Sequence, residues 1–586
     1  MSYSKLSMTL LVKHSSVFPD EKVDIQALIK PYGRTLILQM VAVLNFTIKQ
    51  GIKDVPKQLR RWFGDDNPLA REVFAKIYDG YRDVLKNGEK LYIINDYANL
   101  KLNDIALTFE DDNNSTTHTN DEVHLNLFKA YLVINEQFLL KQDNVGNTLP
   151  EGITGIDKAG WLATTALISS YDFTYGDEPN ILLPQLIKAN YCFKFLINYN
   201  PAAFDLYQKK LNIKNFIDYS KRILPLVNLA LSDVVSFDVQ ENTDKSFLAL
   251  YDHLQDIEAS DENALDYDFL AIRNRPLFKI SENRYLILNR SMIINKVYAS
   301  IYWDMKAIFA ANPQLNISQN KFRADYTTLF SEEFLFYQLM ERAYANKPYK
   351  RFSGRQMKAI IGNTEPDYYV RNGNKLFLYE VKDSFIAGKY KQSFNATEIE
   401  KELKEKYFGE EGGAHEKAVK QLVTRIKKAL LKDYSFDNQY NTRNLNIYPI
   451  LVVYDINLTV PGVERILMNW FDQEILKLNE EMVAKNIPNY RVNNLVILHI
   501  DGLAMLSEYI HMNKLKMEDL IDNYLNRYRK LLKQRNGMTF EKAKTNVLAS
   551  YLSFQHFVQD CLLNTPPKNR LLPHELRDLY RLSIPE

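Results

Sequence analysis

The sequence feature that most constrains the fold is an Asn372-Gly373 pair set between two short apolar segments, in TEPDYYVRNGNKLFLYEVK (364–382). Such a pair strongly favours a two-residue β-hairpin turn, because both residues tolerate the positive φ angles that tight hairpin turns require. The flanking segments are apolar enough to be buried, yet they contain Asp367, Glu380 and Lys382. The sequence therefore predicts a hairpin whose ionisable groups need an explanation beyond packing.

The hairpin register predicts which of these groups lie together. With Asn372 and Gly373 as the loop, Asp367 lies opposite Leu378. Side chains alternate between the two faces of a strand, so Asp367, Glu380 and Lys382 share one face. Asp367 and Glu380 become diagonal cross-strand neighbours, with Cβ atoms about 7–8 Å apart or somewhat less. The other face is apolar and is predicted to be core: Tyr368, Val370, Phe377, Tyr379 and Val381.

Two adjacent carboxylates repel each other, so one must be protonated or a cation must lie between them. Because the hairpin offers oxygen ligands without His or Cys, Mg²⁺ or Mn²⁺ is favoured over Zn²⁺. Lys382 would orient a water molecule or stabilise charge developing on a phosphate. A solvent-facing strand edge carrying a Glu–Lys pair is the alternative.

Pro366-Asp367 followed by Glu380-Val381-Lys382 resembles the motif of the PD-(D/E)XK nuclease superfamily. The resemblance implies that Asp367 and Glu380 bind the metal, aided by the backbone carbonyl of Val381, and that Lys382 positions the attacking water. It also implies a restriction-endonuclease-like core, which is a mixed α/β sheet flanked by helices. A glutamate on the first core helix and a glutamine on the helix after the lysine complete the site in many members.

Residues 326–344 (YTTLFSEEFLFYQLMERAY) have apolar residues at helical spacing and include Glu332 and Glu333. Glu332 has apolar neighbours three, four and seven residues away, which turns it toward the core. A carboxylate there is costly to bury unless it is paired or bound to a metal. Glu332 thus fits the family's helix glutamate better, and Glu333 is better explained as a surface charge.

Residues 414–432 (AHEKAVKQLVTRIKKALLK) predict a strongly amphipathic helix after the lysine. Gln421 lies at the edge of its apolar stripe and is the candidate glutamine. The polar side is rich in basic residues that would contact a phosphate backbone, with a solvated basic face as the alternative. The candidates for nucleic-acid binding are Lys417, Lys420, Arg425 and Lys428.

Further along, an apolar strand (447–455), a helix (461–479) and a second strand (492–500) make a unit that usually gives parallel neighbouring strands. We therefore divide the chain into a mainly α-helical accessory or sensor domain (1–272), a hairpin and bridging helix (273–320), the nuclease-like α/β core (321–515) and a helical C-terminal segment (516–586). Within the first domain, a helical stretch over 203–231 is expected to break near Pro225.

Composition narrows the function. The net charge of +2 over 586 residues means that any nucleic-acid surface must be local. Two cysteines exclude a disulfide scaffold and a cysteine-based zinc site, and they fit a reducing cytoplasm. No apolar run reaches membrane-spanning length, so no membrane partner is expected. No Walker-type or GxGxxG loop is present, which argues against an ATP-driven translocase in this chain.

The expectation is a cytoplasmic, Mg²⁺- or Mn²⁺-dependent endonuclease that acts on nucleic acid, DNA rather than RNA. A nuclease with a large helical sensor domain resembles bacterial restriction or anti-phage effectors. Two alternatives remain: an inactive nuclease-fold module for nucleic-acid binding or assembly, and an RNase with the same site. The N-terminal domain would mediate contact with a partner protein or with a second copy of the chain.

Overall fold

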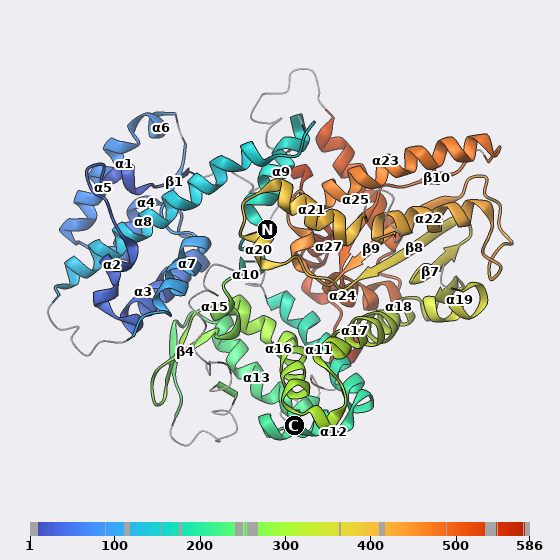
Figure 1. Ribbon diagram of the computed structural model, residues 1–586, viewed down its shortest axis with the longest axis horizontal. Helices are drawn as coiled ribbons and strands as arrows, with labels where there is room; N and C mark the ends of the chain where they lie inside the picture. Colours follow the sequence, from blue (N-terminus) through green and yellow to red (C-terminus); the bar gives the residue numbers. More distant parts are fainter. Residues whose placement is uncertain are drawn as a thin grey trace.

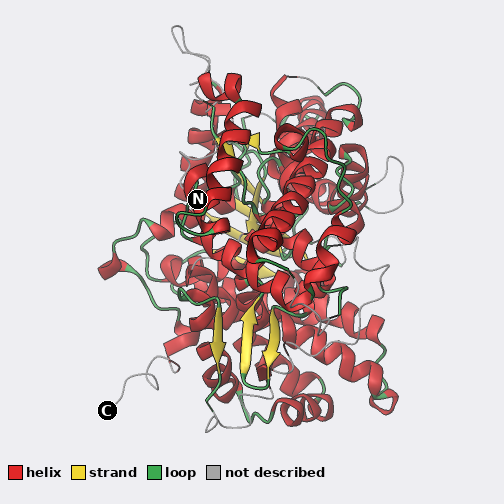
Figure 2. Ribbon diagram, turned by 90° about the vertical axis from the view of Figure 1, so that its left-hand side faces the viewer, coloured by secondary structure: helices red, strands yellow, loops and turns green. Residues whose placement is uncertain are grey.

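The computed structural model describes residues 10–87, 89–110, 118–153, 155–174, 179–240, 250, 251, 254, 268–362, 365–409, 416–487, 489–533, 546, 547, 549–577 and 579. These residues form a mixed α/β structure in which helices pack around a central sheet (Figures 1 and 2). The α/β class predicted from the sequence is confirmed.

The largest sheet among the described residues has six strands, and the hairpin lies at its centre. Strands β6, β7 and β8 are antiparallel neighbours, whereas β9 runs parallel to β8, β10 and β11. The bounds are β6 Lys350–Ser353, β7 Tyr368–Asn372, β8 Lys375–Lys382, β9 Asn446–Val453, β10 Arg491–Val492 and β11 Val496–His499.

Both faces of this sheet are covered. Leu376 and Leu378 of β8 pack in one apolar cluster with Leu422 of α22 (Ala418–Leu431), and Phe377 and Tyr379 pack in the other. Strand β9 has a nearly continuous apolar sequence, as a strand buried on both faces requires. The helices around the sheet are α17 Gln319–Asp325, a π-helix Tyr326–Phe336, α18 Tyr337–Tyr344, α19 Gly354–Ile361, α20 Gly388–Lys391, α21 Ala396–Tyr407, α23 Val463–Ala484, α24 Ile500–His511, α25 Met517–Leu532 and α27 Phe554–Leu563.

The hairpin is present, but its predicted register is wrong by two residues. Asn372 pairs with Lys375, so the loop is Gly373-Asn374 and Asp367 lies opposite Glu380 rather than Leu378. Gly373 takes the first loop position with φ of 59°, which glycine adopts at little cost. Because the shift is an even number of residues, each side chain keeps its predicted face.

The predicted strand–helix–strand unit is also present, although its second strand is divided. Asn493 interrupts it by donating its side-chain amide to Asn446 Oδ1 (2.8 Å) and to the Ile447 carbonyl (3.0 Å). Two short strands, β10 and β11, therefore replace the single strand predicted over 492–500, and both run parallel to β9. Strand β6 and helix α19, which precede the hairpin, were not predicted.

The described residues before position 275 are mainly helical, as predicted. The bounds are α1 His14–Val17, α2 Ile25–Ile29, α3 Arg34–Lys49, α4 Val55–Phe63, α5 Pro68–Gly80, α6 Arg82–Lys86, α7 Asp96–Ala106, α8 Asn120–Asn144, α9 Gly155–Leu167, α10 Tyr171–Thr174, α11 Pro179–Tyr199, α12 Pro201–Leu211, α13 Phe216–Leu231 and α15 Leu270–Asn274. Helix α13 continues through Pro225, so the break predicted there is wrong. The chain instead turns at Asn212 (φ 50°), and the side chain of Asn215 caps α13.

A short parallel pair, β1 Leu10–Leu11 and β2 Leu91–Tyr92, lies among these helices. A small antiparallel sheet and a long helix connect this region to the core: β3 Ser236–Asp238, β4 Leu277–Ser281, β5 Arg284–Ile287 and α16 Arg290–Ala311. Strand β3 was not predicted. None of the described helices alone has the length and apolar composition needed to cross a membrane, although Ile25–Tyr32 and Arg34–Lys49, bent by 104°, meet these criteria as a pair.

Candidate functional site

Three ionisable side chains meet at the open end of the hairpin. Lys382 Nζ lies 2.7 Å from Glu380 Oε1, and the backbone N–H of Val381 donates to Asp367 Oδ2 at 2.6 Å. Directly opposed residues have Cβ atoms about 4.5–5.5 Å apart, closer than in the predicted diagonal arrangement. The Glu380 side chain is only 3% exposed, so this is a buried acid held in ion pairing with a lysine.

The fourth charged group comes from the helix before the hairpin. Glu332 lies in the π-helix Tyr326–Phe336, a form that is rare and frequently found at functional sites. It accepts a hydrogen bond from Tyr337 Oη at 3.2 Å, and it is close enough to Glu380 for the two charges to interact. Glu333 instead pairs with Arg355 on the adjacent helix α19. The two glutamates thus have different partners, Tyr337 for Glu332 and Arg355 for Glu333.

These groups perturb one another strongly. Burial raises the pKa of Glu332 to about 7; the Tyr337 hydrogen bond opposes this shift and the charge of Glu380 adds to it. Burial, with the charges of Glu380 and Glu332, also raises the pKa of Asp367 well above its usual range. Burial alone would lower the pKa of Lys382, but Glu380 and Asp367 outweigh it and raise that pKa. The site thus brings three carboxyl groups together with one lysine, and burial favours the protonated form of two of them, Asp367 and Glu332.

The pKa of Glu332 predicts a stability change with pH. Its unfolded value is 4.5 and its folded value is about 7, so the folded state binds more protons between them. This contribution is fully present below about pH 4.5 and is lost as the pH rises through 7. We expect Glu332→Gln, which is neutral at every pH, to lose less stability between pH 5 and pH 8, by on the order of 2 kcal/mol. Urea unfolding in EDTA measures this difference.

The neighbouring substitution Glu333→Gln is the matched control. It removes the same charge from a pair with Arg355, whose side chain is 70% exposed, so little change is expected. If the free energy of unfolding depended on pH equally in wild type and Glu332→Gln, the pKa of Glu332 would be close to its unfolded value. The carboxyl group of Glu332 would then not interact with the charge of Glu380.

Gln421 lies on α22, which packs on the Glu380 face of β8. Its Oε1 is buried and has no hydrogen-bond partner among the described residues. The Oε2 atom of Glu380 is likewise buried and has no hydrogen-bond partner among the described residues. An unpartnered buried oxygen costs free energy, so each of these two atoms is a place where a donor or a cation would be favourable.

The predicted basic residues of α22 have unequal surroundings. Arg425 Nε donates to the carbonyl of Glu365, two residues before Asp367, at 2.7 Å, so Arg425 borders the site directly. Lys420 lies over the Phe408 ring, 4.5 Å from its centroid. Lys417 is exposed at the start of the helix, and burial together with Arg425 lowers the pKa of Lys428. These four basic residues lie on one side of the helix, and their side chains differ in exposure and in contacts.

Sequence reasoning did not single out Asp383, which follows Lys382. Its carboxylate accepts from Ser331 Oγ at 2.6 Å and from Arg323 at 3.0 Å. Ser331 precedes Glu332, so this contact ties the helix that carries Glu332 to the strand end that carries Lys382. The signal in the sequence was an acidic residue directly after the motif, whose partner lies 52 positions upstream. Asp383 thus holds the two segments together through Ser331 and Arg323.

The donor chemistry fits a hard divalent cation. Carboxylate oxygens of Asp367 and Glu380 with the Val381 carbonyl are oxygen ligands of the kind that Mg²⁺ and Mn²⁺ prefer. The unpartnered Oε2 of Glu380 and the raised pKa of Asp367 are what a nearby cation would relieve. In the part of the chain that the structure describes, however, no three His, Cys, Asp or Glu side chains are grouped closely enough to hold a metal ion.

Comparison with protein-family models, curated proteins and solved structures finds no match to this chain. The site is therefore interpreted from its own geometry and from the motif.

Proposed function

We propose that the protein is a metal-dependent nuclease that hydrolyses phosphodiester bonds, with DNA as the preferred substrate. The observation that carries this proposal is the convergence of Asp367, Glu380 and Lys382 at one end of the hairpin, with Glu332 beside them. Structural ion pairs are seldom built with this excess of buried acid, whereas perturbed carboxyl groups are typical of catalytic sites.

Each group has a distinct part in this proposal. Asp367, Glu380 and the Val381 carbonyl hold the cation, which when bound supplies electrostatic stabilisation of the phosphate undergoing attack. Lys382 donates hydrogen bonds to the attacking water and to the substrate phosphate. Glu332, whose pKa is about 7, holds or releases a proton near neutral pH. The amide of Gln421 orients the groups around it.

The arrangement of elements supports the proposal. The helix containing Glu332 is followed by the antiparallel strands β6, β7 and β8, then by α22 and the parallel strand β9. That order agrees with the restriction-endonuclease-like core which the motif resemblance implies. Because folds host many functions, the order of elements adds weight only in combination with the charged groups.

The side chains bordering the site favour a nucleic acid over a small phosphate ester. Arg425 contacts the chain just before Asp367, and further basic residues follow along α22. Phosphate contacts spaced along a helix suit a polymer backbone. The choice of DNA over RNA follows from the resemblance to restriction enzymes, and an RNase with the same site is the second candidate.

Asp367→Asn tests the proposal, because asparagine keeps an acceptor for the Val381 N–H but removes the charge. Wild type is expected to nick supercoiled plasmid in Mg²⁺ and not in EDTA, and the variant to be inactive in both. Calorimetric titration with Mn²⁺ should show binding to wild type only. Parallel reactions with single-stranded RNA distinguish the two substrates.

Asp519→Asn, an exposed acid in the first turn of α25, is the matched control and should behave as wild type. Mn²⁺ binding that is identical in wild type and Asp367→Asn would contradict the proposal. Absence of both binding and cleavage would favour the other alternative, an inactive nuclease-fold module.

A further inference from the structure

A second site lies between the N-terminal helices and the segment that follows Lys382. A cavity of about 670 Å³ opens there, bounded by α7 and α8 on one side and by residues 389–401 on the other. Its volume is within the range of pockets that hold small ligands. Residues of α7 and of α20 both line the cavity. The cavity is separate from the hairpin site and shares no residue with it.

The cavity is lined by four lysines: Lys101, Lys141, Lys389 and Lys401. Two acids also line it, but one of them is neutralised, since Asp268 Oδ1 pairs with Lys391 at 2.6 Å and with Arg273 at 2.7 Å. The other, Glu398, is exposed at the start of α21. Lysines therefore outnumber acids in the lining by four to two and come from two separate parts of the chain, and one of them, Lys101, also lies 4.0 Å from Asp104.

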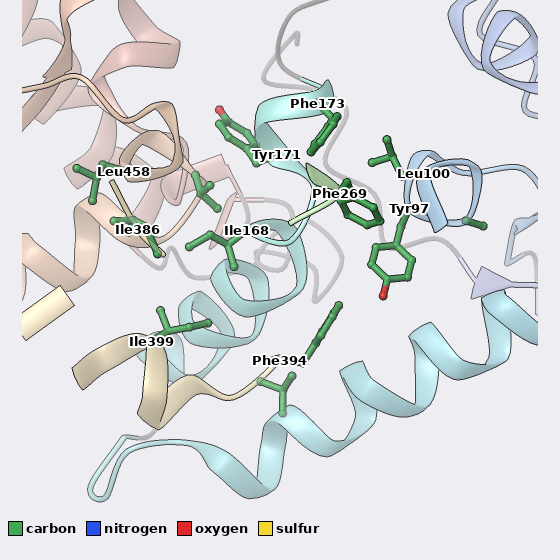
Figure 3. Packing of buried hydrophobic residues seen from close by; sticks show 14 of the residues in the cluster. Tyr97, Leu100, Ile168, Tyr171, Phe173, Phe269, Ile386, Phe394, Ile399 and Leu458 are labelled. Carbon is green, nitrogen blue, oxygen red and sulfur yellow. The ribbon is translucent and has the colours of Figure 1, made fainter. Parts of the chain in front are cut away.

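The aromatic side chains of Tyr97 and Phe269 line the cavity beside the lysines, and the rings of Phe138 and Phe394 pack against Tyr97. Tyr97 stacks on Phe138 with ring centroids 4.3 Å apart, and the rings of Phe269 and Phe394 each meet Tyr97 edge-on at 5.9 Å. Figure 3 shows Tyr97, Phe269 and Phe394 gathered from three distant segments. Tyr390 is a further, partly exposed wall residue. Cations beside aromatic faces are a combination that suits a nucleotide, with its phosphates and its base.

The backbone around this cavity is strained. Asp268, Phe269 and Phe394 have φ angles of 67°, 53° and 52°, in the left-handed region that bulky residues avoid. Each such residue costs about 1–3 kcal/mol and persists only where the surroundings enforce it, as often happens at ligand sites. Because residue 388 is a glycine, its backbone can lie close to Asp268; a Cβ atom at this position would be 2.5 Å from Asp268 Cβ.

We propose that this cavity binds a small ligand with clustered phosphate groups, either a nucleoside polyphosphate or an inorganic polyphosphate. The proposal rests on three features: the lysines from both walls, the aromatic residues that line the cavity, and the strained backbone beside it. It does not depend on the nuclease assignment. Bound phosphates would bridge α8 and α21, which belong to different parts of the chain. The ligand would thus stabilise the whole protein against thermal unfolding.

The test uses the full chain in EDTA, which keeps divalent cations away from both sites. Inorganic tripolyphosphate, ATP and adenosine are titrated by calorimetry, and Tm is measured with each. Tripolyphosphate and ATP should bind and raise Tm, whereas adenosine should not. ATP binding at least about tenfold tighter than tripolyphosphate identifies a nucleotide site, and equal binding identifies a site for the phosphate chain alone.

Lys389→Gln/Lys401→Gln should weaken binding of both phosphate compounds by about tenfold or more. Because both side chains are exposed at the rim, the Tm without ligand should not change, which verifies folding. Lys57→Gln/Lys530→Gln removes the same charge from exposed positions elsewhere and should leave binding intact. Lys382→Ala should also bind normally. Failure of both phosphate compounds to bind, equal binding by the rim variant, or loss of binding in Lys382→Ala would overturn the proposal.

Discussion

Lys382→Ala is expected to lower the rate of plasmid cleavage in Mg²⁺ by at least about 100-fold, the usual effect of removing one charge-stabilising donor from an active site. The ammonium group lies 2.7 Å from Glu380, at the end of a central strand, so its position is closely fixed. In the proposed reaction it contacts the water and the phosphate, and alanine can replace neither contact. Initial nicking rates measured with excess enzyme report the cleavage step without turnover.

The same variant should still bind Mn²⁺ in a calorimetric titration, since the carboxyl groups of Asp367 and Glu380 remain. This separates Lys382 from Asp367, whose replacement should abolish both binding and cleavage. Lys358→Ala removes an exposed lysine from α19 and is the control for lost surface charge. Cleavage by Lys382→Ala at the wild-type rate would remove the basis of the nuclease proposal.

Asp437→Ala should destabilise the protein by about 3–5 kcal/mol, the cost of breaking a buried ion pair by removing one partner. The Asp437 carboxylate is fully buried and accepts from Arg371 (2.5 and 2.8 Å), Lys350 (3.0 Å) and Tyr369 (2.8 Å). Burial alone would raise the pKa of Asp437, but these hydrogen bonds outweigh it and lower the pKa. Without the carboxylate, the Arg371 guanidinium, whose side chain is 10% exposed, loses its partner.

Urea unfolding followed by far-UV circular dichroism measures this loss. Asp433→Ala, an exposed acid four positions earlier in the same loop, should change stability by no more than about 0.5 kcal/mol. Asp437→Asn retains acceptor oxygen and should lie between the two. A loss below about 1 kcal/mol in Asp437→Ala would mean that the network around Arg371 contributes far less than its burial indicates.

The alternation of side chains along the hairpin allowed the two faces to be predicted from the sequence. Asp367, Glu380 and Lys382 lie together because their side chains point to the same face of the sheet. A change in register of two residues does not alter which face a side chain occupies. Helical spacing similarly separated Glu332 from Glu333.

The register itself was not predictable from the Asn-Gly pair. Lys375 pairs on both sides, with Asn372 in β7 and with Asn446 in β9, and the second contact lies 71 positions away. Strand β6 is four residues long and carries Lys350 and Arg351, so it has little apolar pattern to detect. The π-helix and the cavity lined by Lys141 and Lys401 likewise depend on tertiary packing that local sequence does not encode.

The position of β8 has a consequence for motion at the candidate site. β8 is hydrogen-bonded to β9 along its full length, whereas its pairing with β7 ends at Tyr379, so Glu380 and Lys382 lie at a strand end that is held by β9. Glu332 comes instead from a π-helix, and Gln421 from a helix that packs against β8, β9 and the neighbouring helices α21 and α23. In the proposed reaction on a polymer, β8 would therefore hold Glu380 and Lys382 in place, while Glu332 and Gln421 would move only with the helices that carry them.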